Sequence, residues 1–251
     1  MLGLGNLLTK SGVIKKFPND FSFNFDGSND NLVLDNESGK LLLNNGASGS
    51  ISVWVYAETL NQTNHDGTDW RYPTIISKSN VHLSLIVDKD GAVLGFYNDG
   101  SAVYNIKTAD SIVSTGSWHH IAWTWNASTS KLYVNGTERY SGSYTPYNMA
   151  SGGNNTDVYI GQNASSNSGN YAKWDGLIDE IAVWRDAELS ASDVAKIASK
   201  PVDLSKASKY ATDRTSNLKL WLRAGDKAEP ESTTAIARQD FYTDFSASDD
   251  Y

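Results

Sequence analysis

The sequence predicts an all-β protein: a two-sheet antiparallel jelly-roll sandwich with one short helix and extended terminal arms. Three observations carry this prediction. Apolar and polar residues alternate with a period of two in many short segments, Gly, Asn and Asp separate these segments, and only one segment has helical periodicity. Short strands joined by frequent turns are typical of sandwiches and jelly rolls, and 251 residues suffice for one large domain.

The strands follow from the alternation. Residues 21–25 place Phe at every second position, and in residues 51–56 the apolar Ile and Val side chains face away from Ser52, Trp54 and Tyr56. Each segment of this kind is expected to bury one face in the core. The remaining strands are expected at residues 81–87, 93–97, 103–106, 118–125, 131–134, 158–162 and 177–184.

Turn signals separate the predicted strands. Asn135-Gly136 is the strongest of them, because both residues tolerate the positive φ angles of a two-residue hairpin turn. Asp90-Gly91 and the stretch 98–100 mark two further turns. Consecutive strands are therefore expected to pair as antiparallel hairpins.

One helix is expected after the last of these strands. Ser190 is suited to cap its N-terminus, and Asp193 in the first turn favours the positive end of the helix dipole. Residues 194–198 supply one apolar face, and Pro201 ends the segment. We expect this helix to cover a sheet edge.

Composition excludes several classes of function. The chain has 21 Lys and Arg against 29 Asp and Glu, a net charge of −8, so we expect no nucleic-acid binding. Cys is absent, which excludes disulfides, thiol catalysis and Cys-ligated zinc. No apolar run approaches the length of a membrane span, and the first apolar run precedes its lysines instead of following them, so we expect neither a membrane span nor a leader.

The predicted organisation has three parts: an N-terminal arm at 1–20, the jelly roll at 21–200, and a C-terminal extension at 201–251. Residues 226–251 contain two basic and seven acidic residues, a net charge of −5. We expect this acidic segment to bind a basic surface on a partner. Apolar residues of the two arms are the candidate interface residues. They are Leu2, Leu4, Trp221, Phe241, Tyr242, Phe245 and Tyr251.

Six short motifs, in this order along the chain, resemble the laminin-G-like jelly rolls of the concanavalin A-like lectin/glucanase superfamily. The resemblance covers about residues 21–200 and implies two antiparallel sheets packed face to face. The motifs are FNFDGSND at 23–30, GSISVWV at 49–55, WHHIA at 118–122, KLYVNG at 131–136, IG at 160–161 and WDGLIDEIAVW at 174–184.

Glycan binding is the first function that this resemblance implies. Exposed aromatic rings stack on the apolar faces of sugars, and Asp or Asn fixes the hydroxyl groups. The polar loops 61–73, 141–157 and 163–173 hold such residues, whereas Trp54, Trp118, Trp123, Trp125 and Trp184 lie in strands and are expected in the core. The candidate glycan-binding residues are Asp69, Trp70, Tyr72, Tyr144, Tyr171 and Trp174.

A structural Ca²⁺ ion is the second implication of the resemblance. Carried over to this sequence, its ligands would be Asp26 and Gly27 in the early turn and Asp179 in the late strand, with Asp30 and Asp175 as substitutes. Hard oxygen ligands beside a glycine turn suit this cation. The alternative is that Asp26 only caps its turn.

Catalysis is not expected, although the superfamily includes glucanases. Glycosidases need two carboxylates that flank the scissile bond. Asp179 and Glu180 are adjacent on a strand and should therefore point to opposite faces, one inward and the other to solvent. No nucleophile elbow or phosphate loop is present, and His119 and His120 are expected to be ordinary strand residues.

A second resemblance is to virion proteins of tailed phages, carried by residues 1–6 and 218–226. It implies a non-enzymatic virion structural protein, a capsid decoration or tail component made in the host cytoplasm. Such a protein would use its arms to bind other virion proteins or itself, and its jelly roll for weak glycan adhesion. The alternatives are a secreted or cell-surface carbohydrate-binding adhesion module of a bacterium and, third, a glycoside hydrolase.

Overall fold

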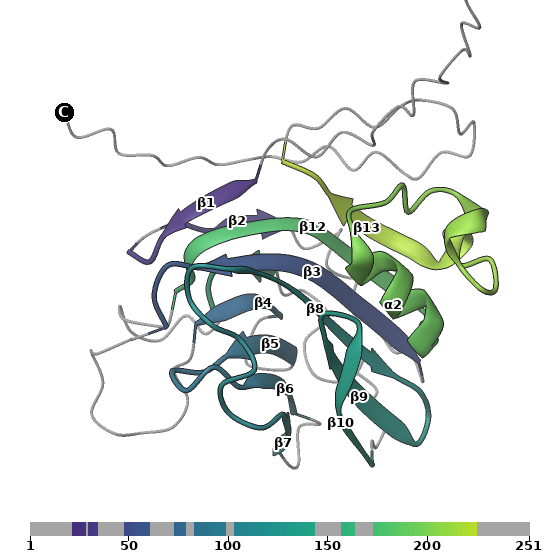
Figure 1. The fold of residues 1–251 in the computed structure, drawn as a ribbon, viewed down its shortest axis with the longest axis horizontal. Helices are drawn as coiled ribbons and strands as arrows, with labels where there is room; N and C mark the ends of the chain where they lie inside the picture. Colours follow the sequence, from purple (N-terminus) through teal and green to yellow (C-terminus); the bar gives the residue numbers. More distant parts are fainter. Residues whose placement is uncertain are drawn as a thin grey trace, which may run out of the picture.

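A computed structural model describes residues 22–28, 30–34, 48–60, 73–78, 83–98, 103–143, 157–163 and 173–224, and the arms at 1–20 and 225–251 lie outside these ranges. Two antiparallel sheets pack face to face, and one helix lies outside them (Figure 1). The predicted jelly-roll sandwich is therefore confirmed. No helix within these ranges is long and apolar enough to cross a membrane.

Sheet A has seven strands and sheet B has six. The order in sheet A is β1-β12-β3-β8-β9-β10, with β13 also paired to β12, and the order in sheet B is β2-β11-β4-β5-β6-β7. Sheet A comprises β1 (Phe23–Asp26), β3 (Gly49–Ala57), β8 (Trp118–Trp125), β9 (Thr129–Val134), β10 (Thr137–Ser143), β12 (Asp175–Arg185) and β13 (Leu218–Leu222). Sheet B comprises β2 (Leu32–Leu34), β4 (Thr74–Lys78), β5 (Leu83–Val87), β6 (Val93–Asn98), β7 (Val103–Lys107) and β11 (Val158–Ile160).

The main core lies between the two sheets. Along β3, Ile51, Val53 and Val55 are completely buried against the inner face of sheet B, as their alternation predicts. Trp123 of β8 is also fully buried, and its indole N–H donates to Ser130 Oγ at 2.7 Å. The polar atom of this large core residue is thus satisfied inside the sheet that carries it.

Two of the predicted turns are confirmed. Asn135 and Gly136 have φ angles of 50° and 77°, so both adopt the left-handed conformation that a tight hairpin between β9 and β10 requires. Gly91, with a φ angle of 77°, connects β5 to β6. A Cβ atom at Gly91 would collide with the carbonyl oxygen of Val113, so the turn and the chain beside it both depend on this glycine.

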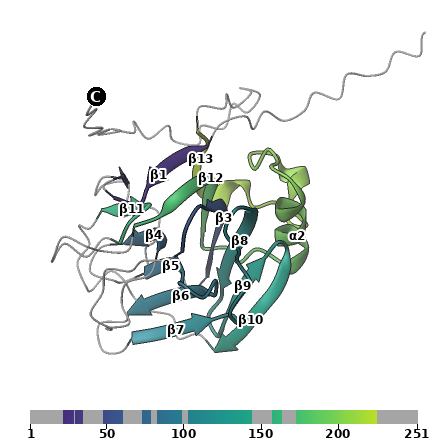
Figure 2. The same ribbon diagram turned by 60° about the vertical axis from the view of Figure 1, so that its left-hand side comes forward.

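Helix α2 (Ala191–Ser199), the α-helix of the described residues, begins as predicted. Ser190 and Asp193 form a reciprocal capping box at its N-terminus. Helix α2 lies against the edge strand β10 and also against β8 (Figure 2), so it covers part of the outer face of sheet A as well as its edge. Val194 and Ile197 pack in the hydrophobic cluster on that face. Two short 3₁₀ helices follow, at Ala207–Lys209 and Thr215–Asn217.

A bulge interrupts β12 between Asp179 and Ala182. Glu180 within it has a φ angle of 51°, and its backbone N–H donates to Asp179 Oδ1 at 2.7 Å. The bulge turns the Glu180 carboxylate toward β13, where it accepts from Trp221 Nε1 at 2.5 Å and pairs with Arg223 Nε at 2.9 Å. Strand β13 is therefore fastened to sheet A by side chains as well as by backbone pairing.

Candidate functional site

The outer face of sheet A is divided into two halves, and one of them is covered. Helix α2 and residues 201–217 bury a second hydrophobic cluster against this half. Trp184 is its largest member, is completely buried, and donates from its indole N–H to the Tyr210 hydroxyl at 3.3 Å. This half has a structural role and offers no surface to a ligand.

The other half of this face carries a row of side chains that we call the aromatic row, in which Trp118 is exposed and Tyr56 and Leu177 are half-buried. The strand register places Leu177 of β12, Tyr56 of β3 and Trp118 of β8 side by side. These residues alternate along their strands with residues of the main core, so their side chains lie on the outer face. The ring centroids of Tyr56 and Trp118 lie 5.9 Å apart, with the rings tilted by 57°. Trp118 is 41% exposed, so its indole presents a broad apolar surface to solvent.

His120 lies next to this row, at the boundary with the covered half. It is fully buried, its Nε2 lies 2.8 Å from Ser52 Oγ, and its ring packs against Trp54 with centroids 5.3 Å apart. Burial lowers the pKa of His120 to about 3, because nothing compensates the lost hydration of a protonated ring. The imidazole therefore stays neutral and acts as a packing residue that supports Trp54.

An acidic row, formed by Asp26, Glu58 and Asp175, borders the aromatic row on the other side. Asp26 lies directly opposite Asp175 in the antiparallel pairing of β1 with β12. The Glu58 N–H donates to the Asp175 carbonyl oxygen at 2.9 Å. Burial raises the pKa of the Asp175 carboxyl, and the charges of Glu58 and Asp26 add to the effect. The neighbouring carboxylates of the acidic row therefore repel one another.

A cleft of about 560 Å³ opens at the same end of the sandwich, beyond Glu58. Leu60 and Val113 provide its apolar lining, whereas Lys89, Asp90 and Asp110 provide charge. The remaining lining residues are Gly91, Ser111, Ser114 and Thr115. Since Thr115 forms a bridge with Ala57, between Tyr56 and Glu58, the cleft adjoins the aromatic row.

Most of the predicted glycan-binding residues lie outside the described ranges: Asp69, Trp70, Tyr72, Tyr144 and Tyr171. Their loops are anchored by residues that the structure does describe. The carbonyl oxygen of Pro73, the last residue of loop 61–73, accepts from the Val87 N–H at 3.1 Å, next to the turn that lines the cleft. Trp174 is completely buried in the main core, so its indole offers no face to a sugar.

The predicted calcium ligands are not brought together. Gly27 has a φ angle of 72° and the Asp26 carboxylate accepts from the Ser28 N–H at 2.6 Å, as in a capped turn. Asp26 lies beside Asp175, four residues before Asp179 on β12, so about 13 Å of strand separates the two predicted ligands. Within the described ranges, no three acidic or His side chains form a metal-binding cluster.

The remaining predicted residues have structural positions or lie in the undescribed arms. Asp179 and Glu180 are both buried, so the expectation that one of them faces solvent is wrong, and the bulge is the reason. Burial raises the pKa of Glu180 to about 7 against the opposing effect of Arg223. Trp221 belongs to β13 rather than to a free arm, so sheet A continues beyond residue 200, where the prediction ended the domain. The other arm residues, Leu2, Leu4, Phe241, Tyr242, Phe245 and Tyr251, lie outside the described ranges.

The aromatic pair of Tyr56 and Trp118 is not among the binding residues predicted from the sequence. The prediction that Trp118 lies in the core is wrong, because 41% of its surface is exposed. The alternation already held the signal, because Tyr56 faces away from Val53 and Val55. Trp118 has the same parity as His120, opposite to the core residue Ile121.

Comparisons with known structures agree with this architecture. Domain 4 of AbnA, a GH43 extracellular arabinanase from Geobacillus stearothermophilus, solved with arabinotriose, has a TM-score of 0.52 at 23% identity, covering 70% of this chain and 76% of that one. The CBM40 of the Ruminococcus gnavus IT-sialidase, bound to alpha2,3 sialyllactose, has a TM-score of 0.54 at 14% identity, covering 70% and 96%. A putative carbohydrate binding protein from Bacteroides ovatus has a TM-score of 0.52 at 15% identity, covering 73% and 47%, so this chain spans less than half of it. At these identities the likeness shows the fold alone.

The sequence itself gives the family. A search of curated proteins finds no match to the chain. The sequence profile described as the concanavalin A-like lectin/glucanases superfamily, of the Laminin_G_3 type, matches residues 26–195, which is more than half of the chain. The chain therefore belongs to the concanavalin A-like lectin/glucanase superfamily.

Proposed function

We propose that this protein is a non-enzymatic carbohydrate-binding module and that a glycan stacks on the open half of the outer face of sheet A. The observation that carries the proposal is the aromatic pair formed by the exposed Trp118 and the half-buried Tyr56, held side by side on neighbouring strands. Aromatic rings on a rigid sheet present flat apolar surfaces that match the C–H faces of pyranose and furanose rings.

The surroundings of the pair supply the polar contacts that a sugar needs. Asn24 of β1 is exposed and lies opposite Leu177, in line with the aromatic row. The cleft beyond Glu58 adds hydroxyl groups from Ser111 and Thr115 at the same end of the sandwich. A few polar groups around an apolar surface are the usual composition of a small-molecule site. The structural likeness to arabinotriose- and sialyllactose-bound domains supports the class of ligand without specifying it.

The direct test is replacement of Trp118 by Ala. A glycan array followed by titration calorimetry with linear arabinan, laminarin, xylan and lactose would identify a ligand for the native chain. We expect Trp118→Ala to lower the affinity for that ligand tenfold or more, because the stacking surface is lost. Trp118→Phe retains an aromatic face and is expected to lose less.

Val33 offers a control for the loss of exposed apolar surface. It is 37% exposed and lies on β2 of the other sheet, away from the aromatic row. Val33→Ala is expected to bind like the native chain. Native-like affinity of the Trp118→Ala variant, or failure of the native chain to bind any of these glycans, would contradict the proposal.

The proposal includes the absence of catalysis. The two carboxylates nearest to a glucanase-like arrangement, Asp179 and Glu180, are both buried, and Glu180 is held by Trp221 and Arg223. Neither is available to flank a scissile bond. We therefore expect no release of reducing sugar from laminarin, arabinan or xylan, and a measurable release would refute this part of the proposal.

We place the module outside the cell, as a secreted or surface-attached adhesion element, which is where polymeric glycans are met. The extracellular arabinanase domain supports this placement by analogy. The virion role stays a prediction that rests mainly on the arms. Mass spectrometry of purified particles would test it independently of glycan binding.

A further inference from the structure

We propose that the site selects uncharged glycans and excludes carboxylated and sulfated ones, because the acidic row borders the aromatic row. The inference rests on the proposed function and assigns it a ligand class. It also predicts a difference from the sialyllactose-bound domain that shares the fold, since sialic acid is an anionic sugar.

Geometry places the negative charge next to the bound sugar. Asp175 lies two residues before Leu177 on β12, and Glu58 lies two residues after Tyr56 at the end of β3. Residues two apart on a strand share a face and are about 7 Å apart. Any ligand stacked on Tyr56 and Trp118 is thus within about 7–10 Å of these carboxylates.

The charge of the row is poorly neutralised. Within the described part of the chain, the carboxylates of Glu58 and Asp175 form neither a hydrogen bond nor an ion pair. Asp30, whose Oδ2 accepts from the Asp26 N–H at 3.0 Å, adds a fourth negative charge. Lys173 donates to the Ser28 carbonyl oxygen next to Asp26, so this end of the row also carries a positive charge, whereas the paired acids Glu58 and Asp175 lie at the end nearer the aromatic row.

The neighbouring cleft shows the opposite arrangement. Each of its acidic side chains has a lysine partner: Lys89 lies 2.9 Å from Asp90, and Lys107 lies 3.1 Å from Asp110. Lys107 also lies 2.8 Å from the buried Asp88. The contrast assigns the charge selectivity to the acidic row, and the cleft contributes little net field.

The size of the effect follows from Coulomb's law. One carboxylate about 7 Å from a ligand anion weakens binding roughly threefold in water, and several act together. We expect about a tenfold preference for the uncharged member of a matched pair in 0.01 M NaCl, where the Debye length is about 30 Å. In 1 M NaCl, with a Debye length of about 3 Å, the preference should fall to about twofold or less.

The experiment compares three uncharged glycans, each with an anionic derivative. Lactose is paired with 3′-sialyllactose, N-acetyllactosamine with its 6-sulfated form, and methyl-esterified homogalacturonan with the de-esterified polymer. Binding to the full chain is measured at both salt concentrations in buffer with EDTA, so that no divalent cation neutralises the row. The expected result is a preference for the uncharged member that disappears at high salt.

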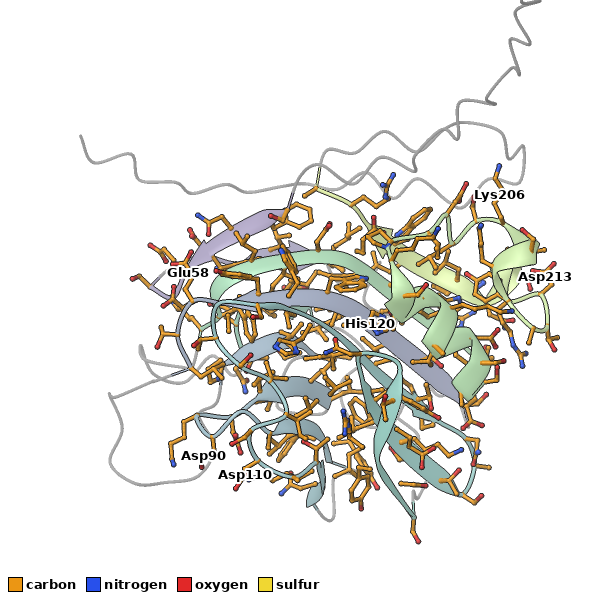
Figure 3. The ribbon with its side chains drawn as sticks, viewed as in Figure 1. Glu58, Asp90, Asp110, His120, Lys206 and Asp213 are labelled. Atoms are coloured by element: carbon orange, nitrogen blue, oxygen red, sulfur yellow. The ribbon has the colours of Figure 1, made fainter. Side chains whose placement is uncertain are left out.

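A double variant identifies the responsible charges. Glu58→Gln with Asp175→Asn removes two carboxylates and should reduce the preference to about threefold or less at low salt. The matched control, Asp186→Asn with Asp213→Asn, removes the same charge far from the row. Asp186 follows β12, and its backbone N–H donates to the Ser48 carbonyl oxygen, at the opposite end of β3 from Glu58. Figure 3 shows Glu58 and Asp213 at opposite ends of the molecule.

The outcomes separate the two proposals. Equal binding of charged and uncharged members at low salt overturns the charge selectivity alone. A preference that is unchanged in the Glu58→Gln, Asp175→Asn variant also overturns it, because the row would then not be its source. If neither member of any pair binds, the proposed carbohydrate-binding function fails first, and the selectivity fails with it.

Discussion

The two halves of the outer face of sheet A use the same residue type for different purposes. Trp184 in the covered half is completely buried and hydrogen-bonded to Tyr210, whereas Trp118 in the open half is 41% exposed and contacts Tyr56. Both residues alternate with core residues in the same way. What separates them is whether a later part of the chain, α2 and the segment that follows it, returns to cover the strand.

The difference shows how one sheet face can be both core and surface. A sheet with two buried faces needs a second apolar layer, and this chain builds that layer over only half of sheet A. The uncovered half retains Trp118 with 41% of its surface exposed. Substitutions on the two sides of this division should therefore affect stability to different degrees.

Trp184→Ala should have the largest effect on stability. Removing a fully buried indole leaves a cavity between sheet A and the segment after α2, and the free energy of unfolding should fall by about 3–5 kcal/mol. Urea denaturation followed by fluorescence measures this loss. Trp184→Phe, which fills part of the space, should lose less, and a loss below about 1 kcal/mol would mean that the covered half is not a second core.

Acid should destabilise the boundary between the two halves through His120. Its pKa of about 3 in the folded protein lies below its ordinary value of 6.5, so between these values the unfolded chain binds more protons than the folded one. The stability conferred by the neutral ring is complete above pH 6.5 and is lost as the pH falls. By pH 4 the loss should reach about 3 kcal/mol.

His120→Gln removes this titration and is the variant that isolates it. Its free energy of unfolding should depend less steeply on pH between 6.5 and 4 than that of the native chain. Parallel pH profiles of the two proteins would argue that other groups cause the acid sensitivity.

Asp193→Ala should have an intermediate effect by loosening the cover. Its carboxylate closes the capping box with Ser190 and accepts from the Ala211 N–H at 2.5 Å, which joins α2 to the segment that follows. We expect a loss of about 1–2 kcal/mol. Hydrogen exchange should show faster opening of residues 191–211, and exchange that is unchanged there would show that the cap does not hold the cover in place.

Trp118→Ala should have the smallest effect on stability, about 0.5–1 kcal/mol, because the indole is already partly hydrated. The same substitution is expected to have a large effect on glycan affinity. Stability should therefore fall more for Trp184→Ala than for Trp118→Ala, whereas Trp118→Ala should have the larger effect on glycan affinity. A loss of 3 kcal/mol or more at Trp118 would show that this residue is structural after all.

Local patterns predicted much of the fold. The alternation in β3, the turn at Asn135-Gly136 and the cap at Ser190 each depend on neighbours within a few residues, and all three are confirmed. The bulge at Glu180 was not predictable, because a non-glycine residue with positive φ leaves no mark in the sequence. The place of β13 in sheet A was also missed, since its pairing with β12 joins segments about 40 residues apart.

The candidate site was predicted less completely than the fold. Period-two patterns assign a side chain to a face, but they do not say which part of that face a later segment covers. The exposure of Trp118 therefore had to come from the structure. The acidic row has the same origin, because Glu58 and Asp175 are more than 100 residues apart in sequence and meet only through the pairing of β3 with β12.

The positions of β1 and β13 have one further consequence. Both strands pair with the same edge of β12, end to end, so that Phe23 lies opposite Ile178 and Leu222 lies opposite Ile181 (Figure 1). The chain thus enters and leaves the sandwich within about 10 Å along one strand. A domain whose ends meet in this way can be circularly permuted, or inserted into a loop of a host protein, without threading a linker across its surface.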